Sequence, residues 1–433
     1  MKQPLLAITL FAVALVSTGA DDAKADDIWK GGSIYSQFGL GMPHDVRSSY
    51  ADGMGVYGTA LYDNRQPGSA NPATWARAVM TNIAGSFEIS SYEAEFDDYR
   101  ANTTGFRTGP LQLVMPVKRN RVGVSFSITP LTSARYATEV TDRMGAAQNI
   151  TGENLHYSVR STGSGGINRI EAGVGVRLTD NISVGYAPSL MLGVIHRNQR
   201  VTIDDPDHRA IVLKERTSHY GFGHRFGVFL EYRDAFREND RMAFGATVSL
   251  PVDLNSERRL ESRIGSSDIT IHPESFYGDG QVTYPLEASA GFTYNINPYW
   301  MISADVLYQN WDEYTNFQGN REPFFNDRMK MGMGTQYIAS RRDVDTFLSR
   351  FIYRMGVSYD TGSLSLNDGQ DIETLTLHAG LGLPSFRTSS SININAEYGF
   401  RGSDGSGLLS ERVFAVRVSF NLSELMFIQR RLQ

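Results

Sequence analysis

The stretch from Tyr284 to Trp311 constrains the fold most, because two long segments of alternating hydrophobicity flank a short turn. Apolar residues alternate with small or polar ones from Tyr284 to Ile296, and again from Trp300 to Tyr308. A period of two is typical of a β-strand with one apolar face. Strands of this length with aromatics near their ends suit a lipid-facing barrel wall, where every backbone group must be paired. A soluble β-sandwich hairpin is the alternative, although its strands are usually shorter.

The N-terminus predicts export. Residues 1–25 have the parts of a signal peptide: Met1-Lys2, the apolar run Leu5 to Val16 and the small-residue site Ala23-Lys24-Ala25. Cleavage after Ala20 is the alternative. The apolar run is too short for a membrane-spanning helix, and no other segment is long and apolar enough.

Composition narrows the chemistry. The chain has no cysteine, which excludes disulfides, thiolate metal sites and a lipidated cysteine. The net charge of −6 is mild and the basic residues are scattered, so nucleic acid is not an expected partner. The 433 residues could form several soluble domains or one large barrel, and only repetition decides between these two.

Repetition favours the barrel. Fourteen alternating segments lie between residues 79 and 422, and the short connections follow even-numbered segments while the longer ones follow odd-numbered segments. Short periplasmic turns and long external loops are typical of outer-membrane barrels. The sequence therefore predicts an all-β fold, a 14-stranded antiparallel transmembrane β-barrel in the outer membrane of a Gram-negative-type bacterium. We expect a monomer whose surroundings are outer-membrane lipid and the barrel-insertion machinery.

The region 26–78 lacks such alternation and is rich in glycine. Its Gly53 to Gly58 stretch fits G-x-G-x-x-G, but without a preceding strand it more simply supplies tight turns. We expect the region to fold into the barrel as a plug, because a lumen this wide is otherwise an aqueous channel. Residues 423–433 form a basic tail that is expected to be periplasmic.

Charged residues on the polar faces of the segments are expected to line the lumen, because charges facing lipid at mid-depth are costly. Their mixed signs favour interior salt bridges over ion conduction. Apolar residues on the same faces either form a path for a hydrophobic solute or pack against the plug. The expected lumen-lining residues are Glu171, Arg177, Arg225, Glu231, Glu287, Asp305, Leu307, Trp311, Arg354, Glu397 and Arg417, and Phe229, Met191 and Ile195 are further apolar ones.

Enzymatic motifs are missing. The sequence has no H-E-x-x-H, no G-x-S-x-G and no P-loop, so no catalytic residue, metal site or cofactor is expected. His378 shares the inward face of its segment, whereas an outer-membrane phospholipase needs an exterior Ser/His pair. The acidic run Asp204 to His208 is better interpreted as a solvated loop than as a calcium site.

The chain resembles the outer-membrane channels for long-chain fatty acids and other hydrophobic compounds (FadL/TodX type). The resemblance rests on Asn71-Pro72-Ala73, on Pro285 with the Gly291 to Tyr294 strand and Ser303 to Trp311, and on Arg354 to Asp360. It implies a fourteen-stranded barrel, an N-terminal hatch, and passive uptake of hydrophobic molecules by lateral diffusion through the wall.

The C-terminus departs from that pattern. Family members often end on an aromatic residue, whereas Phe420 is followed by Asn421 to Gln433 with a basic Arg430-Arg431 end. This resembles a basic-tailed branch that includes the shuttle subunit of type IX secretion. A shuttle or binding subunit for secreted proteins and a polar-solute porin therefore remain as alternative functions.

A lateral exit is expected at Pro130. The segment from Val122 alternates until Thr129, and Pro130 lacks the backbone donor that a continuing ladder requires. The resemblance implies that Asn71, Pro72 and Ala73 of the hatch pack against this break and gate it. The alternative is that Pro130 merely ends the strand at the membrane surface.

Overall fold

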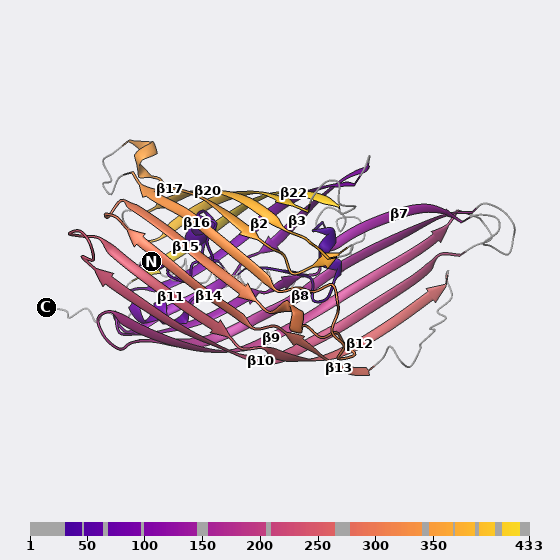
Figure 1. Cartoon of the computed structure of the whole chain (residues 1–433), viewed down its shortest axis with the longest axis horizontal. Coiled ribbons are helices and arrows are strands. Elements are labelled where there is room, and N and C mark those ends of the chain that lie inside the picture. The colour runs from indigo at the N-terminus through magenta and orange to yellow at the C-terminus, as the bar shows by residue number, and fades with distance from the viewer. Residues whose placement is uncertain are drawn as a thin grey trace, which may run out of the picture.

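The computed structural model describes residues 31–45, 47–63, 68–96, 99–144, 155–204, 209–264, 278–339, 346–366, 369–385, 389–402 and 409–424. The expected signal peptide, most of the basic tail and residues 205–208 of the acidic run lie outside these ranges. Within the described part, fourteen antiparallel strands close into a single barrel (Figure 1), which confirms the predicted fold class. No described helix is both long and apolar enough to cross a membrane.

Four of the barrel strands are interrupted and therefore carry two labels each. In chain order the strands are β2 (Thr81–Phe96), β3 (Tyr99–Thr108) with β4 (Leu111–Lys118), β5 (Val122–Pro130) with β7 (Tyr136–Met144), β8 (Leu155–Arg177), β9 (Ile182–Ile203), β10 (Ile211–Arg233), β11 (Arg241–Ser249) with β12 (Val252–Ile264), β13 (Gly278–Tyr284) with β14 (Glu287–Asn295), β15 (Trp300–Gln309), β16 (Arg328–Ile338), β17 (Ile352–Asp360), β20 (Thr374–Pro384), β21 (Ser391–Arg401) and β22 (Ser410–Glu424).

Each interruption coincides with a proline: Pro110, Pro130, Pro251 and Pro285. Proline has no N–H to donate to a ladder, so it is tolerated only where pairing stops or a strand bends. The barrel closes where β2 pairs with β22, from Thr81 opposite Glu424 to Glu95 opposite Ser410.

The hairpin that most constrained the fold is formed by β14 and β15, with Phe292 opposite Ala304 and Thr293 opposite Ser303. Outward side chains such as Ile302 are exposed as a lipid-facing wall requires, whereas Thr293 and Ser303 are buried and hydrogen-bonded to each other at 2.9 Å. The first strand of the hairpin was expected to begin at Tyr284. In the structure Tyr284 ends β13, and β14 begins at Glu287, because Pro285 interrupts the strand.

Strands β8, β9 and β10 have 23, 22 and 23 residues. The alternating pattern in the sequence ends near His196 in β9 and begins near Tyr220 in β10, but the ladder continues from Tyr220 opposite Leu192 to Ile211 opposite Val201. Both faces carry polar residues there, so the pattern of a lipid-facing strand is lost although the pairing is not. With β7, β12 and β13 these strands form a sheet that projects beyond the rest of the barrel, toward the right in Figure 1.

Short elements complete the description. They are η1 (Ile34–Gln37), β1 (Met42–Pro43), α2 (Ser49–Asp52) and η2 (Pro72–Arg77) before the barrel, and β6 (Thr132–Ser133), η5 (Trp311–Glu313), η6 (Phe347–Arg350), β18 (Ser365–Leu366) and β19 (Gln370–Asp371) within its connections.

Candidate functional site at the interrupted third strand

The third barrel strand is interrupted between Pro130 and Tyr136. Before the break, β5 pairs with β4 and β8; after it, β7 pairs with β8, whereas β3 pairs only with β2. Among the described strands no ladder joins β3 to β7, so this seam of the wall is open in backbone terms. Leu131 and Ala134 turn inward and are buried in an apolar cluster.

The residues before the barrel, 31–45, 47–63 and 68–78, are called the N-terminal segment, and its first part covers this open seam. Its strand β1 pairs with β6, with Met42 opposite Ser133 and Pro43 opposite Thr132. Gly31 lies against the backbone of Thr104 in β3, and Gly32 lies against the backbone of Arg135. A side chain at either glycine would approach that backbone closer than 3.0 Å, so these two positions allow the chain to pass between β3 and the break.

The Asn71-Pro72-Ala73 motif is not at this break. Asn71 caps η2 through the Ala73 N–H at 3.0 Å and donates to the Val228 carbonyl at 2.9 Å. The helix η2 packs on β5, β8, β9 and β10 near Gly123, which is seven residues from Pro130 and thus about 23 Å along the strand. The structure therefore brings residues 31–43, rather than the motif implied by the family resemblance, to Pro130.

A belt of inward-facing glycines makes room for η2. Gly123, Gly175, Gly185 and Gly227 are paired in register across β5, β8, β9 and β10. A Cβ atom on any of them would lie closer than 3.0 Å to atoms of residues 71–76. The belt continues as Gly245 and Gly291 against Thr59 and Ala60, and as Gly332, Gly334 and Gly356 against Met54 and Gly55.

Ion pairs also hold the segment against the wall. Arg417 of β22 contacts both Asp52 of α2 and Glu88 of β2, and all three side chains are at most 4% exposed. Asp45 contacts Arg328 at 2.9 Å and Lys330 at 2.5 Å, both from β16. Although burial raises the pKa of Asp45, the two cations outweigh that effect and hold its pKa well below the usual range.

The expected lumen-lining charges are placed on this inner surface with one exception. Seven of them contact the N-terminal segment or one another: Arg225 pairs with Glu171, Glu231 with Arg77, Glu287 with Tyr57, Asp305 with the Tyr57 and Gly58 N–H groups, Glu397 with Arg47, and Arg417 with Asp52. The eighth, Arg354, donates to Gln336 of β16 and Asn393 of β21. Arg177 instead lies at the short-turn rim, where it contacts Asp180 at 3.1 Å.

The inward apolar residues are packed. Leu307 contacts Tyr57 and Ala70, and Phe229 contacts Tyr62 and Ala73 of the N-terminal segment. Met191, Ile195 and Trp311 belong to the cluster that contains Leu131, and Trp311 lies in η5 rather than in a strand. Of the two interpretations of these residues, packing against the segment is the one that the geometry shows.

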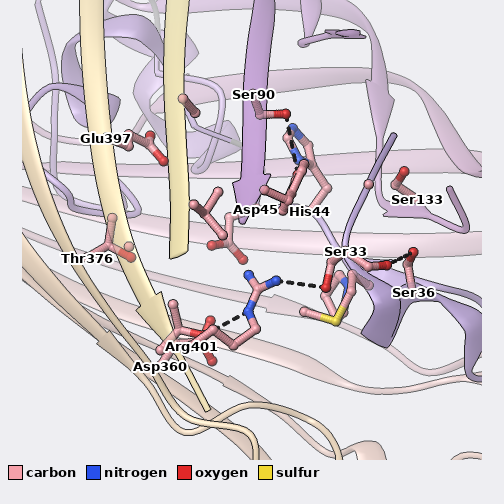
Figure 2. Close-up of a pocket in the computed structure, with 18 of the residues that line it drawn as sticks. Ser33, Ser36, His44, Asp45, Ser90, Ser133, Asp360, Thr376, Glu397 and Arg401 are labelled. Carbon is pink, nitrogen blue, oxygen red and sulfur yellow. Dashed lines mark hydrogen bonds between the residues drawn. The ribbon is translucent and has the colours of Figure 1, made fainter. Parts of the chain in front are cut away.

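A cavity of about 130 Å³ lies between the segment and the wall (Figure 2). Ser33, Ser36, His44 and Asp45 line it from the segment, and Asp360, Thr376, Glu397 and Arg401 line it from the wall. Asp45, Arg47 and Asp52 were missed by the sequence reasoning because their region lacks periodicity. Lys330, on the inward face of an expected strand, was detectable from alternation.

We expect His44 to make the attachment of the N-terminal segment depend on pH. Burial lowers the pKa of this side chain from 6.5 to about 3, and Arg107 and Arg417 add to the effect. A free His44 takes up a proton near pH 6.5, so docking is strongest above that pH and weakens as the pH falls toward 3. We expect a nitroxide label on Gln37→Cys to become more mobile between pH 7.5 and 4.5. The change should be smaller with His44→Gln, and an identical change in both proteins would contradict it.

Comparisons with known proteins agree with the architecture. No curated protein sequence matches the chain. Its structure is similar to the "CymD monoaromatic hydrocarbon channel" (TM-score 0.55, 14% identity, covering 88% of this chain and 98% of that one) and to the Pseudomonas putida toluene transporter TodX (0.55, 12%, 88% and 98%). A Pseudomonas aeruginosa FadL homologue is similar with a TM-score of 0.55 and 13% identity, covering 88% of this chain and 98% of that one. At such identities the likeness shows the fold.

The sequence itself gives the family. The family model described as BamG matches residues 7–433, which is nearly the whole chain. The FadL/TodX resemblance inferred from short motifs is thus a relationship of fold, and the basic-tailed branch has no counterpart in these matches. The chain belongs to the BamG family.

Proposed function

We propose that this protein is an outer-membrane channel for hydrophobic small molecules, and that the interrupted third strand is its lateral exit. One observation carries the proposal: β3 and β7 share no described ladder, and residues 31–43 occupy the seam between them. In the conformation described here the exit is shut, because the inward apolar residues are packed and β1 is paired with β6. Passage then requires β1 to separate from β6.

A disulfide lock tests the exit. Met42→Cys with Ser133→Cys places two cysteines opposite each other in an otherwise cysteine-free chain, where paired Cβ atoms are about 5 Å apart. Oxidation should greatly reduce uptake of toluene and oleate by cells, and reduction should restore it. The matched control is Thr293→Cys with Ser303→Cys, a facing pair within the wall. If the cross-link between positions 42 and 133 forms and uptake is unchanged, the proposal is wrong.

Orientation follows from the loop lengths. We expect the connection 145–154 to be outside the cell and the turn at Asp180 to be periplasmic, because outer-membrane barrels keep their short turns on the periplasmic side. An epitope tag at Asn149 should bind antibody on intact cells, and a tag at Asp180 should bind only after permeabilisation. The reverse result would invert the topology.

A second candidate is a partner-binding subunit, the shuttle alternative raised by the sequence. The observation in its favour is the packed interior, since Leu307, Phe229 and Trp311 are all at most 1% exposed and form no apolar passage. This function predicts no uptake in the reduced cysteine variant, together with co-purification of a partner. The same packing counts against a polar-solute porin.

A further inference from the structure

The sheet that projects beyond the barrel has two unlike faces. Alternate residues of β10 that are exposed on the lipid side, Tyr220 at 54% and Phe222 at 74%, are followed on the same face by Ser218, Arg216, Lys214 and Val212. The opposite face continues the inner surface of the barrel. The outward face of β10 therefore changes from aromatic to basic along one strand.

Neighbouring strands carry cations at the same levels. Arg216 is paired with His196 of β9 and Arg259 of β12. Val212 is paired with Arg200 and Arg263, and Arg200 is paired with Arg160 of β8. Since directly paired residues share a face, these side chains form one patch, which we call the basic face. Its residues are Arg160, His196, Arg200, Lys214, Arg216, Arg259 and Arg263.

Part of this charge is available to a ligand. Glu139, Glu257 and Glu261 share the face, and Arg259 contacts Glu257 at 2.7 Å. Arg200, Lys214 and Arg216 are exposed, and within the described residues none of them forms an ion pair. Cross-strand cations this close repel one another, so an anion that bridges them is favourable.

The other side of the rim is acidic. Beyond the outward ends of β15 to β20 lie exposed Asp312, Glu313, Asp327, Asp371 and Glu373, with Arg321 as a counterion of Asp312 at 3.6 Å. The projecting sheet also carries exposed carboxylates, with Asp253 and Asp279 on the same outward face, so the two sides differ in the balance of their charges. What distinguishes the side of β8–β12 is its three exposed cations without an ion pair among the described residues, Arg200, Lys214 and Arg216, and these favour an anionic ligand there.

Depth identifies that surrounding. Arg216 and Val212 are four and eight residues beyond Tyr220, which is about 13 to 27 Å along a strand and, at a tilt near 45°, about 9 to 19 Å above the level of Tyr220. The basic face thus continues the lipid-facing surface into the headgroup zone. Polybasic surfaces at this level attract anionic lipids.

We propose that the basic face binds the phosphate groups of the anionic glycolipid of the outer leaflet, the lipopolysaccharide, along β8, β9, β10 and β12. The proposal rests on the outer-membrane location and outward orientation given above, but not on any transport. Guanidinium groups pair with phosphate oxygens in a bidentate way, and Lys214 adds a point charge. Lipid phosphates would then fix which side of the rim faces the glycolipid most closely.

The test uses the full-length protein purified in nonionic detergent, with deep-rough lipopolysaccharide as the probe and binding read by native mass spectrometry. The triple variant Arg200→Gln, Lys214→Gln, Arg216→Gln should bind at least tenfold more weakly, because each cation near anionic lipid contributes roughly fivefold. The control removes the same charge at the other rim: Lys118→Gln, Arg119→Gln, Arg121→Gln, at exposed positions. This control should bind as the wild type does.

Two further arms identify the ligand. Dephosphorylated glycolipid should bind the wild type as weakly as the phosphorylated glycolipid binds the triple variant. Millimolar inorganic phosphate should leave glycolipid binding intact. Wild-type affinity in the triple variant, equal binding of the dephosphorylated glycolipid, or full competition by free phosphate would each overturn the proposal. Because no uptake is measured, failure here is distinguishable from failure of the channel proposal.

Discussion

Replacing Gly185 and Gly227 by valine is expected to convert the closed barrel into an open pore. Both glycines face η2, and a Cβ atom on either would lie closer than 3.0 Å to Asn71, Pro72 or Ala73. Those neighbours are largely backbone or the proline ring, which cannot rotate away, so the helix must leave its position. A wide barrel without its filling is an aqueous channel. Planar-bilayer recordings should therefore show large, steady conductance steps where the wild type shows none.

A matched control separates this effect from damage to the wall. Gly399→Val adds the same side chain to β21, where the nearest atoms are threonine side chains at 3.2 to 3.8 Å and the N-terminal segment is not among them. This variant should stay closed. Heat-modifiable gel mobility checks that each barrel is folded. If the double variant folds and remains closed, the glycine belt does not hold the segment.

The second large effect is expected from Arg417→Met. Arg417 contacts Asp52 and Glu88, so its removal leaves two buried carboxylates, each with one remaining cation: Arg47 at 3.3 Å for Asp52 and Arg107 for Glu88. Breaking a buried pair by removing one partner costs about 3 to 5 kcal/mol. We expect a loss of this size in urea unfolding, together with greater mobility of a label on Gln37→Cys.

The same substitution at Arg100 provides the comparison. Arg100 is 65% exposed and contacts Glu95 at 2.8 Å, so solvent screens the pair and Arg100→Met should cost far less than Arg417→Met. In the Arg417→Met background, Asp52→Asn should recover part of the loss, because it removes one stranded charge. Equal costs for the two arginines would show that the contacts to Asp52 and Glu88 contribute little.

The barrel was predictable because each lipid-facing strand carries its own evidence. The alternating pattern around Phe292 or Ile302 can be recognised from the neighbouring residues in the sequence alone. The lengths of the connections then support the number of strands. The inward direction of charges such as Glu171 and Arg417 follows from the same period of two. Their partners do not follow, since Arg417 meets Asp52 from the far end of the chain.

Two other features escaped prediction for physical reasons. The upper halves of β9 and β10 carry polar residues outward, so a pattern tuned to lipid contact ends near Tyr220 although hydrogen bonding continues to Ile211. Asn71-Pro72-Ala73 was expected beside Pro130, where the structure places residues 31–43. A short sequence motif does not indicate how far it lies from another part of the fold. Residues 31–43 are aperiodic, and their place is fixed by glycine contacts and by the pairing of β1 with β6.

The contact between the glycine belt and the N-terminal segment also constrains the order of assembly. The segment is translated before β2, and the barrel closes only when β22, the last strand, pairs with β2. Backbone packed this closely on strands from β5 to β17 cannot be threaded into a finished ring. We therefore expect the segment to be in place while the sheet is still open, so that the last strands close around it.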